Sequence, residues 1–262
     1  MSQKAYERRK NILNQIEAYG NLKVEDLLKQ YSVSAETIRR DLRILESEGL
    51  LKKTYGGAAV LEKTTRYTPY QERLNINSLE KQAIGEAGSR LLEEGDSVFI
   101  EGKTTCLALS KLIPPHMELT VVTNSIYVAY NLARENSKIK VFLAGGQLNT
   151  DGMTYGPKLY QELKGYRFDK AFISSVSVNS LGCYFSKPEP MQLAQTLPAL
   201  TSELILLSDS SKVGKSAFLL GIPISQIQYL ITDEGSPIDV LQKIKDTGCK
   251  VIVAPLENQK AQ

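Results

Sequence analysis

Hydrophobic and polar positions recur with two different periods along the chain, and the change of period divides it. In residues 1–60 apolar side chains return every three or four positions, which predicts helices over residues 7–19, 24–31 and 35–48. Two short apolar runs around Gly56-Gly57 follow and predict a β-hairpin over residues 50–60. Three helices followed by a hairpin is the plan of a winged helix-turn-helix domain.

From about residue 75 onward, apolar runs rich in β-branched residues alternate with amphipathic segments. After a helix ending near Leu92, seven strands are predicted, over residues 97–100, 119–123, 140–144, 170–174, 204–208, 229–232 and 251–254. Most are separated by segments with helical spacing, at residues 104–112, 126–134, 158–163, 191–200 and 239–245. This alternation predicts a mostly parallel α/β domain over residues 75–262, joined to the first domain by a linker over residues 61–74.

Charge adds an asymmetry between the two predicted domains. The 262 residues are 42% hydrophobic and 23% charged, which is ordinary for a globular protein, and the net charge is only +3. Residues 1–66 hold 13 Lys and Arg against 9 Asp and Glu, whereas the remainder holds 19 against 20. The basic excess therefore lies in the N-terminal quarter, as expected where a nucleic acid binds.

The remaining composition narrows the class of protein. The first residues do not resemble a signal peptide, and no apolar run approaches the roughly 20 residues of a membrane span. Cys106, Cys183 and Cys249 are widely spaced and have no metal-ligand spacing. We therefore expect a cytoplasmic protein with free thiols, no membrane partner, no metal and no cofactor.

The helix predicted after Ser34 has an apolar stripe and a cationic face. Ile38, Leu42 and Leu45 fall at i, i+4 and i+7, and the arginines lie on the other side. Alone, this is also the pattern of a solvated charged helix; beside a basic hairpin it suits the DNA major groove. The predicted DNA-binding residues are Ser34, Thr37, Arg39, Arg40, Arg43, Lys52, Lys53 and Tyr55.

A family resemblance covers the whole first domain. Residues 37–42 (TIRRDL), with Leu45, Glu46, Gly49 and residues 55–58 (YGGA), resemble the DNA-binding signature of DeoR-family bacterial repressors. In that family the first of these runs lies on the recognition helix. The resemblance implies that double-stranded operator DNA is the partner.

Polar residues follow several predicted strands at the point where each strand ends. The carboxyl ends of parallel strands share one edge of a sheet, where ligands bind. Small hydroxyl, amide and glycine residues there suit a phosphate, and lysines add charge, although each loop alone is also ordinary turn chemistry. The candidate effector-binding residues are Glu101, Lys103, Thr104, Thr105, Thr123, Asn124, Ser125, Gly145, Gly146, Asp209 and Lys212.

The second domain resembles the DeoR-family effector domain, which is related in fold to ribose-5-phosphate isomerase and glucosamine-6-phosphate deaminase. The matching segments are residues 101–105, 119–125, 145–146, 156, 169–172 and 209–212. In the family this domain binds a phosphorylated sugar, and binding changes operator affinity. This chain departs from the family pattern where Lys103 replaces a glycine and Glu101 an aspartate, where residues 174–179 (SSVSVN) replace a glycine-rich run, and where residues 189–196 lack a helix lysine.

These observations predict a transcriptional repressor of a carbohydrate-utilisation operon, controlled by a phosphorylated sugar. A homodimer or homotetramer is expected, because one small winged helix supplies too few contacts for operator affinity. The alternative is a sugar-phosphate isomerase or deaminase with a DNA-binding appendage, for which Glu101, Asp209 and Asp233 are candidate acids or bases. We assign no catalytic residue, because no histidine is near and the helix lysine is missing. A DNA architectural protein with an inert second domain would leave the polar strand ends unexplained.

Overall fold

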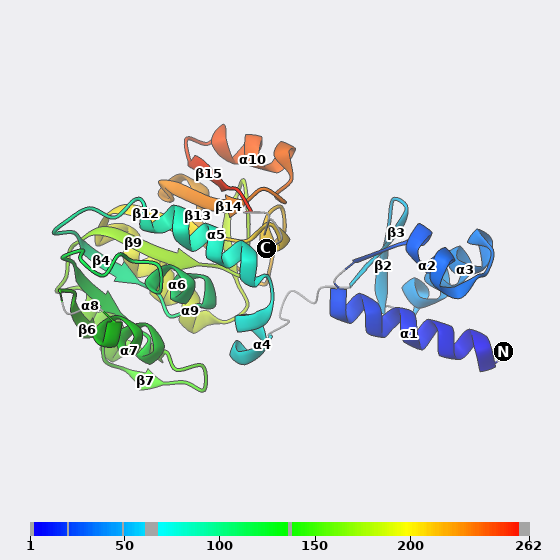
Figure 1. Cartoon of the computed structure of the whole chain (residues 1–262), viewed down its shortest axis with the longest axis horizontal. Helices are drawn as coiled ribbons and strands as arrows, with labels where there is room; N and C mark the ends of the chain where they lie inside the picture. The colour runs from blue at the N-terminus through cyan, green and yellow to red at the C-terminus, as the bar shows by residue number, and fades with distance from the viewer. Residues whose placement is uncertain (1–2, 20, 49, 61–67, 136–137, 257–262) are drawn as a thin grey trace, which may run out of the picture. The chain divides into compact units, whose positions relative to one another are not determined.

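The structure is a computed structural model that describes residues 3–19, 21–48, 50–60, 68–135 and 138–256. By its internal contacts the chain divides into two compact units, residues 1–63 and residues 64–262 (Figure 1). Gly49, predicted at the end of the third helix, and residues 61–67 of the predicted linker lie outside the described residues.

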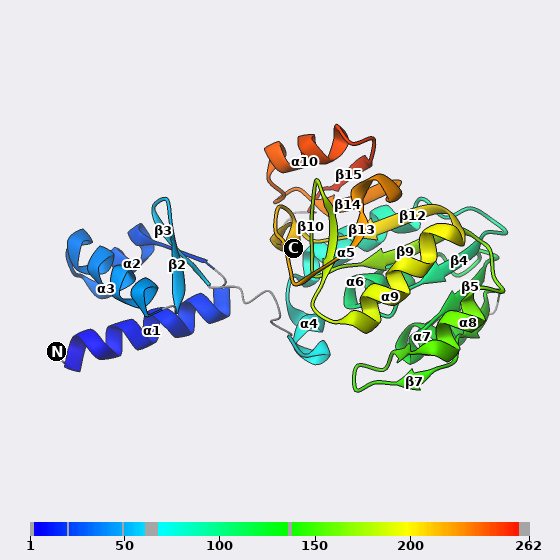
Figure 2. The same ribbon diagram turned by 180° about the vertical axis from the view of Figure 1, so that it is seen from behind.

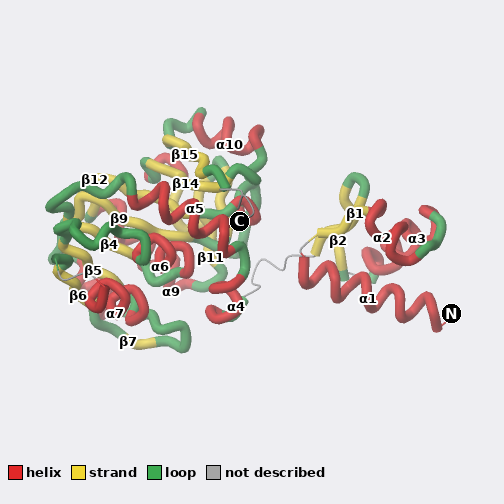
Figure 3. The backbone as a smooth tube through the Cα atoms, viewed as in Figure 1, coloured by secondary structure: helices red, strands yellow, loops and turns green. Residues whose placement is uncertain are grey.

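The first unit contains three helices and a small antiparallel sheet (Figure 3). The helices are α1 (Gln3–Tyr19), α2 (Val24–Tyr31) and α3 (Ala35–Ser47). The strands are β1 (Asn21–Lys23), β2 (Leu51–Thr54) and β3 (Gly57–Val60), in the order β1-β3-β2. The predicted helices and hairpin are confirmed, with α1 beginning earlier than expected. Strand β1 was not predicted, because three residues are too few to show an alternating pattern.

The hairpin is fixed to the helices by two glycines. Gly56 has a φ of +84°, a backbone conformation that favours glycine. A Cβ on Gly57 would lie 2.1 Å from the carbonyl oxygen of Leu22, so β1 and β3 can approach only because position 57 has no side chain. The Val24 amide donates to the Gly56 carbonyl at 2.8 Å, which ties the turn to the start of α2.

The second unit is built on a seven-stranded sheet in which every neighbouring pair is parallel. Its order is β15-β14-β12-β9-β4-β5-β6. The strands are β4 (Ser97–Ile100), β5 (Thr120–Thr123), β6 (Lys140–Leu143), β9 (Phe168–Ser174), β12 (Thr201–Leu207), β14 (Tyr229–Asp233) and β15 (Lys250–Ala254). All seven predicted strands are confirmed. Those in the middle of the sheet were recognisable because central parallel strands are buried on both faces and are therefore continuously apolar.

Helices cover both faces of this sheet. Figures 1 and 2 show α5 and α6 on one face and α9 on the opposite face. The helices are α4 (Tyr70–Asn75), α5 (Ser78–Ser89), α6 (Thr104–Ser110), α7 (Ile126–Glu135), α8 (Pro157–Leu163), α9 (Pro188–Thr196) and α10 (Ile238–Lys245). Residues 70–74, which the sequence assigned to the linker, belong to α4.

Two smaller antiparallel pieces were not predicted. One is the sheet β10-β11-β13, formed by Ser177–Asn179, Gly182–Phe185 and Leu219–Pro223. The other is the pair β7 (Gln147–Leu148) and β8 (Thr154–Tyr155). Their strands are short and rich in polar or glycine residues, so their pattern is that of a loop.

The connectivity of the large sheet reverses at its middle. From β4 the chain runs outward through β5 and β6, then returns to place β9 on the other side of β4 and continues through β12, β14 and β15. The loops leaving β4 and β9 therefore diverge. In open α/β sheets, such a switch point creates a crevice at the carboxyl ends of the strands.

Candidate functional site

A cavity of about 480 Å³ lies at this switch point, a size suited to a small-molecule ligand. It is lined by residues after β4, β9 and β12, by α4 and α5, and by β7, β8 and the segment after β11. Among the lining residues are Arg73, Asn77, Lys81, Lys103, Thr104, Asp151, Tyr155, Ser174, Ser175, Lys187, Glu189, Asp209, Ser211 and Lys212. Of the eleven predicted effector-binding residues, the cavity thus brings together Lys103, Thr104, Asp209 and Lys212.

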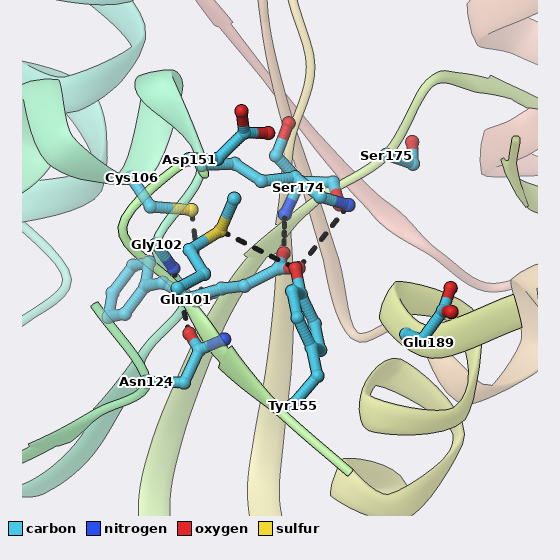
Figure 4. Close-up of polar contacts among 12 residues, drawn as sticks. Glu101, Gly102, Cys106, Asn124, Asp151, Tyr155, Ser174, Ser175 and Glu189 are labelled. Atoms are coloured by element: carbon cyan, nitrogen blue, oxygen red, sulfur yellow. Dashed lines mark hydrogen bonds and ion pairs between the residues drawn. The ribbon is translucent and has the colours of Figure 1, made fainter. Parts of the chain in front are cut away.

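Glu101 lies beneath the cavity rather than in its lining. The side chain is fully buried, and Figure 4 shows its carboxylate reaching toward Ser174. One oxygen accepts the Ser174 amide at 2.9 Å, and the other lies 3.3 Å from the Lys103 ammonium. Glu101 therefore joins the ends of β4 and β9 and supplies a counter-charge to Lys103.

The Lys103 ammonium is held inside the protein. It donates to the Ser174 carbonyl at 2.7 Å and lies 4.4 Å from the centre of the Phe185 ring. Burial lowers the pKa of Lys103, while the neighbouring Glu101 carboxylate raises it. Lys103 thus fills the turn after β4 and links it to β9 and β11.

The candidates after β5 brace the turn after β4. Asn124 is fully buried; its side-chain oxygen accepts the Gly102 amide at 3.0 Å and its nitrogen donates to the Thr154 carbonyl at 3.1 Å (Figure 4). The Thr123 hydroxyl accepts the Ser125 amide at 3.2 Å, and both residues are fully buried. These three side chains contact the protein rather than the cavity.

The other candidates also lie outside the cavity lining. Thr105 is fully buried, and its hydroxyl has no hydrogen-bond partner in the described part of the chain. The Gly145 amide donates to the Glu162 carboxylate at 2.9 Å. A Cβ on Gly146 would lie 2.6 Å from the Tyr155 carbonyl oxygen, so this glycine permits the close approach of β8.

Three cationic lining residues, Arg73, Lys81 and Lys187, were not predicted. The Arg73 guanidinium contacts the Asp151 carboxylate at 3.1 Å and donates to the Thr68 carbonyl at 3.0 Å. The Lys81 side chain is only 5% exposed, and its ammonium donates to the carbonyls of Arg73 and Ile76. Arg73 and Lys81 come from α4 and α5, which precede the first strand of the large sheet. A search for polar residues at strand ends could therefore not find them.

Lys81 and Lys212 place two positive charges on one side of the cavity. Burial lowers the pKa of Lys81 to about 8, and the Lys212 ammonium contributes to the lowering. The Lys212 ammonium lies 2.9 Å from one carboxylate oxygen of Asp209. The other oxygen accepts a hydrogen bond from the side-chain amide of Asn77 at 2.9 Å. Burial raises the pKa of Asp209, but Lys212, Ser211 and Asn77 together lower it to about 2.

The cavity therefore presents a cluster of fixed cations at its wall. Arg73, Lys103 and Lys212 each contact a carboxylate, whereas the two hydrogen bonds of the Lys81 ammonium go to main-chain carbonyls. A buried ammonium near other cations favours an anionic ligand. Hydroxyl groups of serine and threonine in the lining provide further donors and acceptors for a polyol.

In the first unit, the predicted DNA-binding residues lie on α3 and the hairpin. Ser34 caps α3, since its hydroxyl accepts the Thr37 amide at 3.2 Å. Arg39 and Arg43 line a groove with Lys53 and Tyr55 of the hairpin. Arg40 and Lys52 are exposed outside this groove, and Arg43 also pairs with Glu36. The arrangement places cations on both the helix and the wing, as DNA phosphates require.

Asp41, within the TIRRDL run, has a structural role that the sequence did not reveal. It is 4% exposed, and its carboxylate accepts from the Arg8 guanidinium at 2.6 Å and lies 3.9 Å from that of Arg9. These contacts join α3 to α1. The spacing is consistent with this role, because Asp41 follows Ile38 by three residues and therefore lies on the buried side of the helix.

Together these features define a class of protein: a winged helix-turn-helix unit followed by an α/β unit with a cavity lined in part by cations. Residues 8–64 match the DeoR-like helix-turn-helix domain, and residues 76–234 match the DeoR C terminal sensor domain. The chain therefore belongs to the DeoR family of transcriptional regulators, which confirms the predicted family and the two-part fold class.

Relatives match along nearly the whole chain. The chain is 29% identical to a putative aga operon transcriptional repressor of Escherichia coli O157:H7, covering 94% of this chain and 93% of the relative. It is 30% identical to the HTH-type transcriptional regulator YulB of Bacillus subtilis (strain 168), covering 97% and 98%. With the repressor GlcR of the same organism it shares 30% identity, covering 87% and 88%.

Solved structures resemble the chain only weakly. A ribose 5-phosphate isomerase A from Methanocaldococcus jannaschii has a TM-score of 0.40 and 13% identity, covering 52% of this chain and 55% of the isomerase. This likeness is too low to argue from. Among the described residues, no helix is long and apolar enough to cross a membrane. Nor do those residues place three His, Cys, Asp or Glu side chains where they would hold a metal ion.

Proposed function

We propose that the protein is a transcriptional repressor of a carbohydrate-utilisation operon, and that a phosphorylated sugar bound in the cavity controls its affinity for operator DNA. The observation that carries this proposal is the cluster of cations around one ligand-sized cavity at the switch point of the sheet. The names of relatives support it: they include the glycerol-3-phosphate regulon repressor of Haemophilus influenzae, which is 28% identical over 94% of this chain.

The DNA-binding residues of this proposal are those predicted from the sequence. Arg39, Arg43, Lys53 and Tyr55 would contact one half-site, because they line a single groove between α3 and the hairpin. Operator affinity generally needs two half-sites, so the protein is proposed to act as a homodimer or a higher oligomer. The effector would favour the arrangement of subunits that fits the operator less well.

The carboxylates considered for catalysis are each held by donors of the protein. Glu101 accepts from the Ser174 amide and contacts Lys103. Asp233 accepts from the Ser210 amide at 2.7 Å and the Gly235 amide at 3.1 Å. Asp209 is held by Lys212 and Asn77. Because a general base needs a lone pair directed at the substrate, these contacts favour a sensor over an isomerase or deaminase.

The experiment measures binding of the purified protein to the DNA upstream of its own gene by fluorescence anisotropy at fixed salt. The titration is repeated with glycerol 3-phosphate, fructose 1-phosphate, glucosamine 6-phosphate, the unphosphorylated sugars and inorganic phosphate. We expect one sugar phosphate to weaken DNA binding about tenfold, equivalent to about 1.4 kcal/mol of coupling. No effect of any phosphorylated compound, with DNA binding intact, would contradict the proposed effector class.

Variants separate the two functions. Lys212→Met should remove the effector response and leave DNA binding intact, because Lys212 lines the cavity of the second unit. The matched control is Arg90→Met: Arg90 is an exposed residue of the same unit, paired only with Glu86 in the described structure. Turnover of aldose or ketose phosphates by the purified protein would instead favour the enzyme.

A further inference from the structure

Helix α4 is the first described element after residues 61–67, and it is held in place largely by residues that line the cavity. A helix of six residues is not stable by itself, so its position depends on tertiary contacts. The Arg73 guanidinium of α4 contacts Asp151 at 3.1 Å. Tyr70, at the start of α4, stacks on Tyr127 of α7 with 5.5 Å between ring centres.

The C-terminal end of α4 is held by the cavity cation Lys81. Its ammonium donates to the carbonyls of Arg73 and Ile76, two of the groups that a helix end leaves without intrahelical partners. A cation at this position also interacts favourably with the helix dipole. Asn77, which follows α4 in a left-handed conformation with φ of +52°, adds a hydrogen bond to Asp209 at 2.9 Å.

The part of the cavity formed by the turn after β4 is less open to an anion. The Lys103 ammonium already donates to the Ser174 carbonyl and contacts Glu101. The Gly102 amide is taken by Asn124, and a Cβ on Gly102 would lie 2.5 Å from Met153, so the turn after β4 is tightly packed. An anion entering the cavity therefore meets Lys81, Arg73 and Lys212, and of these Lys81 and Arg73 also hold α4 in place. Burial and the nearby Lys212 charge lower the pKa of Lys81, a cost that a bound anion would relieve.

We propose that the anionic group of the effector binds Lys81 and Arg73, and that this binding releases α4. A phosphate dianion is a stronger acceptor than a carbonyl and carries more charge than a carboxylate, so it draws the ammonium away from the end of α4 and the guanidinium away from Asp151. The helix then loses the contacts that stabilise it, so residues 68–77 open more often. This inference rests on the proposed function, and the experiment below separates the two.

The test is hydrogen–deuterium exchange of the full chain, read by mass spectrometry, with and without glycerol 3-phosphate, fructose 1-phosphate, glucosamine 6-phosphate and inorganic phosphate. For a compound that calorimetry shows to bind, we expect exchange in residues 68–77 to become at least threefold faster. Ligands ordinarily slow exchange near their site, so the direction is diagnostic. A bound compound that leaves exchange there unchanged or slower overturns the inference, while the proposed function stands if that compound also weakens DNA binding. If none of the compounds binds, both fail together.

Two variants, one within α5 and one at its C-terminal end, sharpen this test. Lys81→Met keeps the buried stem and removes the ammonium; residues 68–77 should then exchange rapidly without ligand, and compound binding should weaken at least tenfold. The matched control, Arg90→Met at the end of the same helix, should behave as the unchanged protein. Unweakened binding by Lys81→Met would place the anion elsewhere and overturn the inference.

A second route remains if Lys81→Met does not fold. Asn77→Gly preserves the left-handed backbone at position 77 and removes the hydrogen bonds of the Asn77 side chain to Asp209 and Ser211. Because Lys81 still holds α4 in this variant, a bound compound should still accelerate exchange in residues 68–77 at least threefold. Loss of that acceleration would assign the release of α4 to Asn77 and Asp209 instead of Lys81, and would overturn the inference.

Discussion

The two units of this chain use positive charge in opposite settings. On α3 and the hairpin, Arg39, Arg40 and Lys52 are exposed to solvent. Around the cavity, Lys81 and Lys103 are less than a tenth exposed, with their ammonium groups held by fixed acceptors. Exposed cations suit a long polyanion, whose binding is driven by release of counterions and is insensitive to exact position. Buried cations in fixed positions select one small anion by its shape.

Asp41 is an exception to this contrast, because it forms a buried ionic contact within the DNA-binding unit. Removing one partner of a buried pair leaves the other charge without compensation. We expect Asp41→Ala to lower the free energy of unfolding by about 3 kcal/mol, measured by urea unfolding of the full chain followed by circular dichroism. Glu36→Ala, which removes the exposed partner of Arg43, is the control and should change it by less than about 0.5 kcal/mol. Equal effects would contradict the structural role of Asp41.

A substitution of Arg40 tests whether the exposed cations of the first unit bind DNA. Arg40 lies on the solvent side of α3, so Arg40→Ala should leave folding intact and weaken binding to upstream DNA by about 1–3 kcal/mol. If Arg40 contacts a phosphate, the slope of log affinity against log salt also becomes shallower by about one unit. The measurement is anisotropy at several salt concentrations, with Arg90→Ala in the other unit as control. Unchanged affinity would remove Arg40 from the interface.

The pH dependence of ligand binding tests the role of the buried cations around the cavity. The pKa of Lys81 is lowered to about 8 by burial and by Lys212 and Arg73, against the opposing effects of Asp209 and Glu80. Its ammonium is thus present below pH 8 and lost above it, whereas a phosphate monoester stays a dianion, with a second pKa of about 6. We expect sugar-phosphate binding to weaken up to about tenfold per pH unit above pH 8.

Calorimetric titrations between pH 7 and 9 measure this dependence, and Lys81→Met should abolish it. For folding the sign is reversed, because the fold favours the neutral amine: the contribution of Lys81 to the free energy of unfolding rises between pH 8 and its model-peptide value of 10.5. A pH profile of ligand binding that is flat in the unchanged protein would exclude Lys81 as an anion-binding residue.

The smallest expected effects concern Thr104 and Thr105, two adjacent residues of which one lines the cavity and the other does not. Only Thr104 lines the cavity, whereas the buried Thr105 hydroxyl lacks a partner among the described residues. Replacing such a group by an apolar one of similar shape removes a desolvation cost, so Thr105→Val should raise the free energy of unfolding by about 0.5 kcal/mol. Thr104→Val should instead reduce the effector response. Destabilisation by Thr105→Val would indicate a hydrogen bond to its hydroxyl.

Elements with a long or strongly periodic pattern could be predicted from the sequence. The stripe of Ile38, Leu42 and Leu45 fixed α3, and the continuous apolar runs fixed all seven strands of the large sheet. Strands of two or three residues, such as β1 and β7, carry too few positions for a period.

The candidate site was less predictable, because the chain direction at a strand end does not determine where a side chain points. Asn124 and Asp209 both follow strands, yet Asn124 turns inward to brace Gly102 and Asp209 faces the cavity. Arg73 and Lys81 reach the cavity from helices that precede the first strand of the sheet. Their proximity depends on packing between distant segments, for which no local spacing is diagnostic.

The order of strands in the large sheet has a consequence for synthesis on the ribosome. Val98 of β4 pairs with Lys170 of β9, and the cavity is completed only by Lys212, so the sensor needs most of the chain. The DNA-binding unit ends by residue 63 and is stabilised by contacts between neighbouring segments. Domains generally fold as they emerge, N-terminal first, and local contacts form faster than distant ones. A nascent chain is therefore expected to fold its DNA reader before it can sense a ligand.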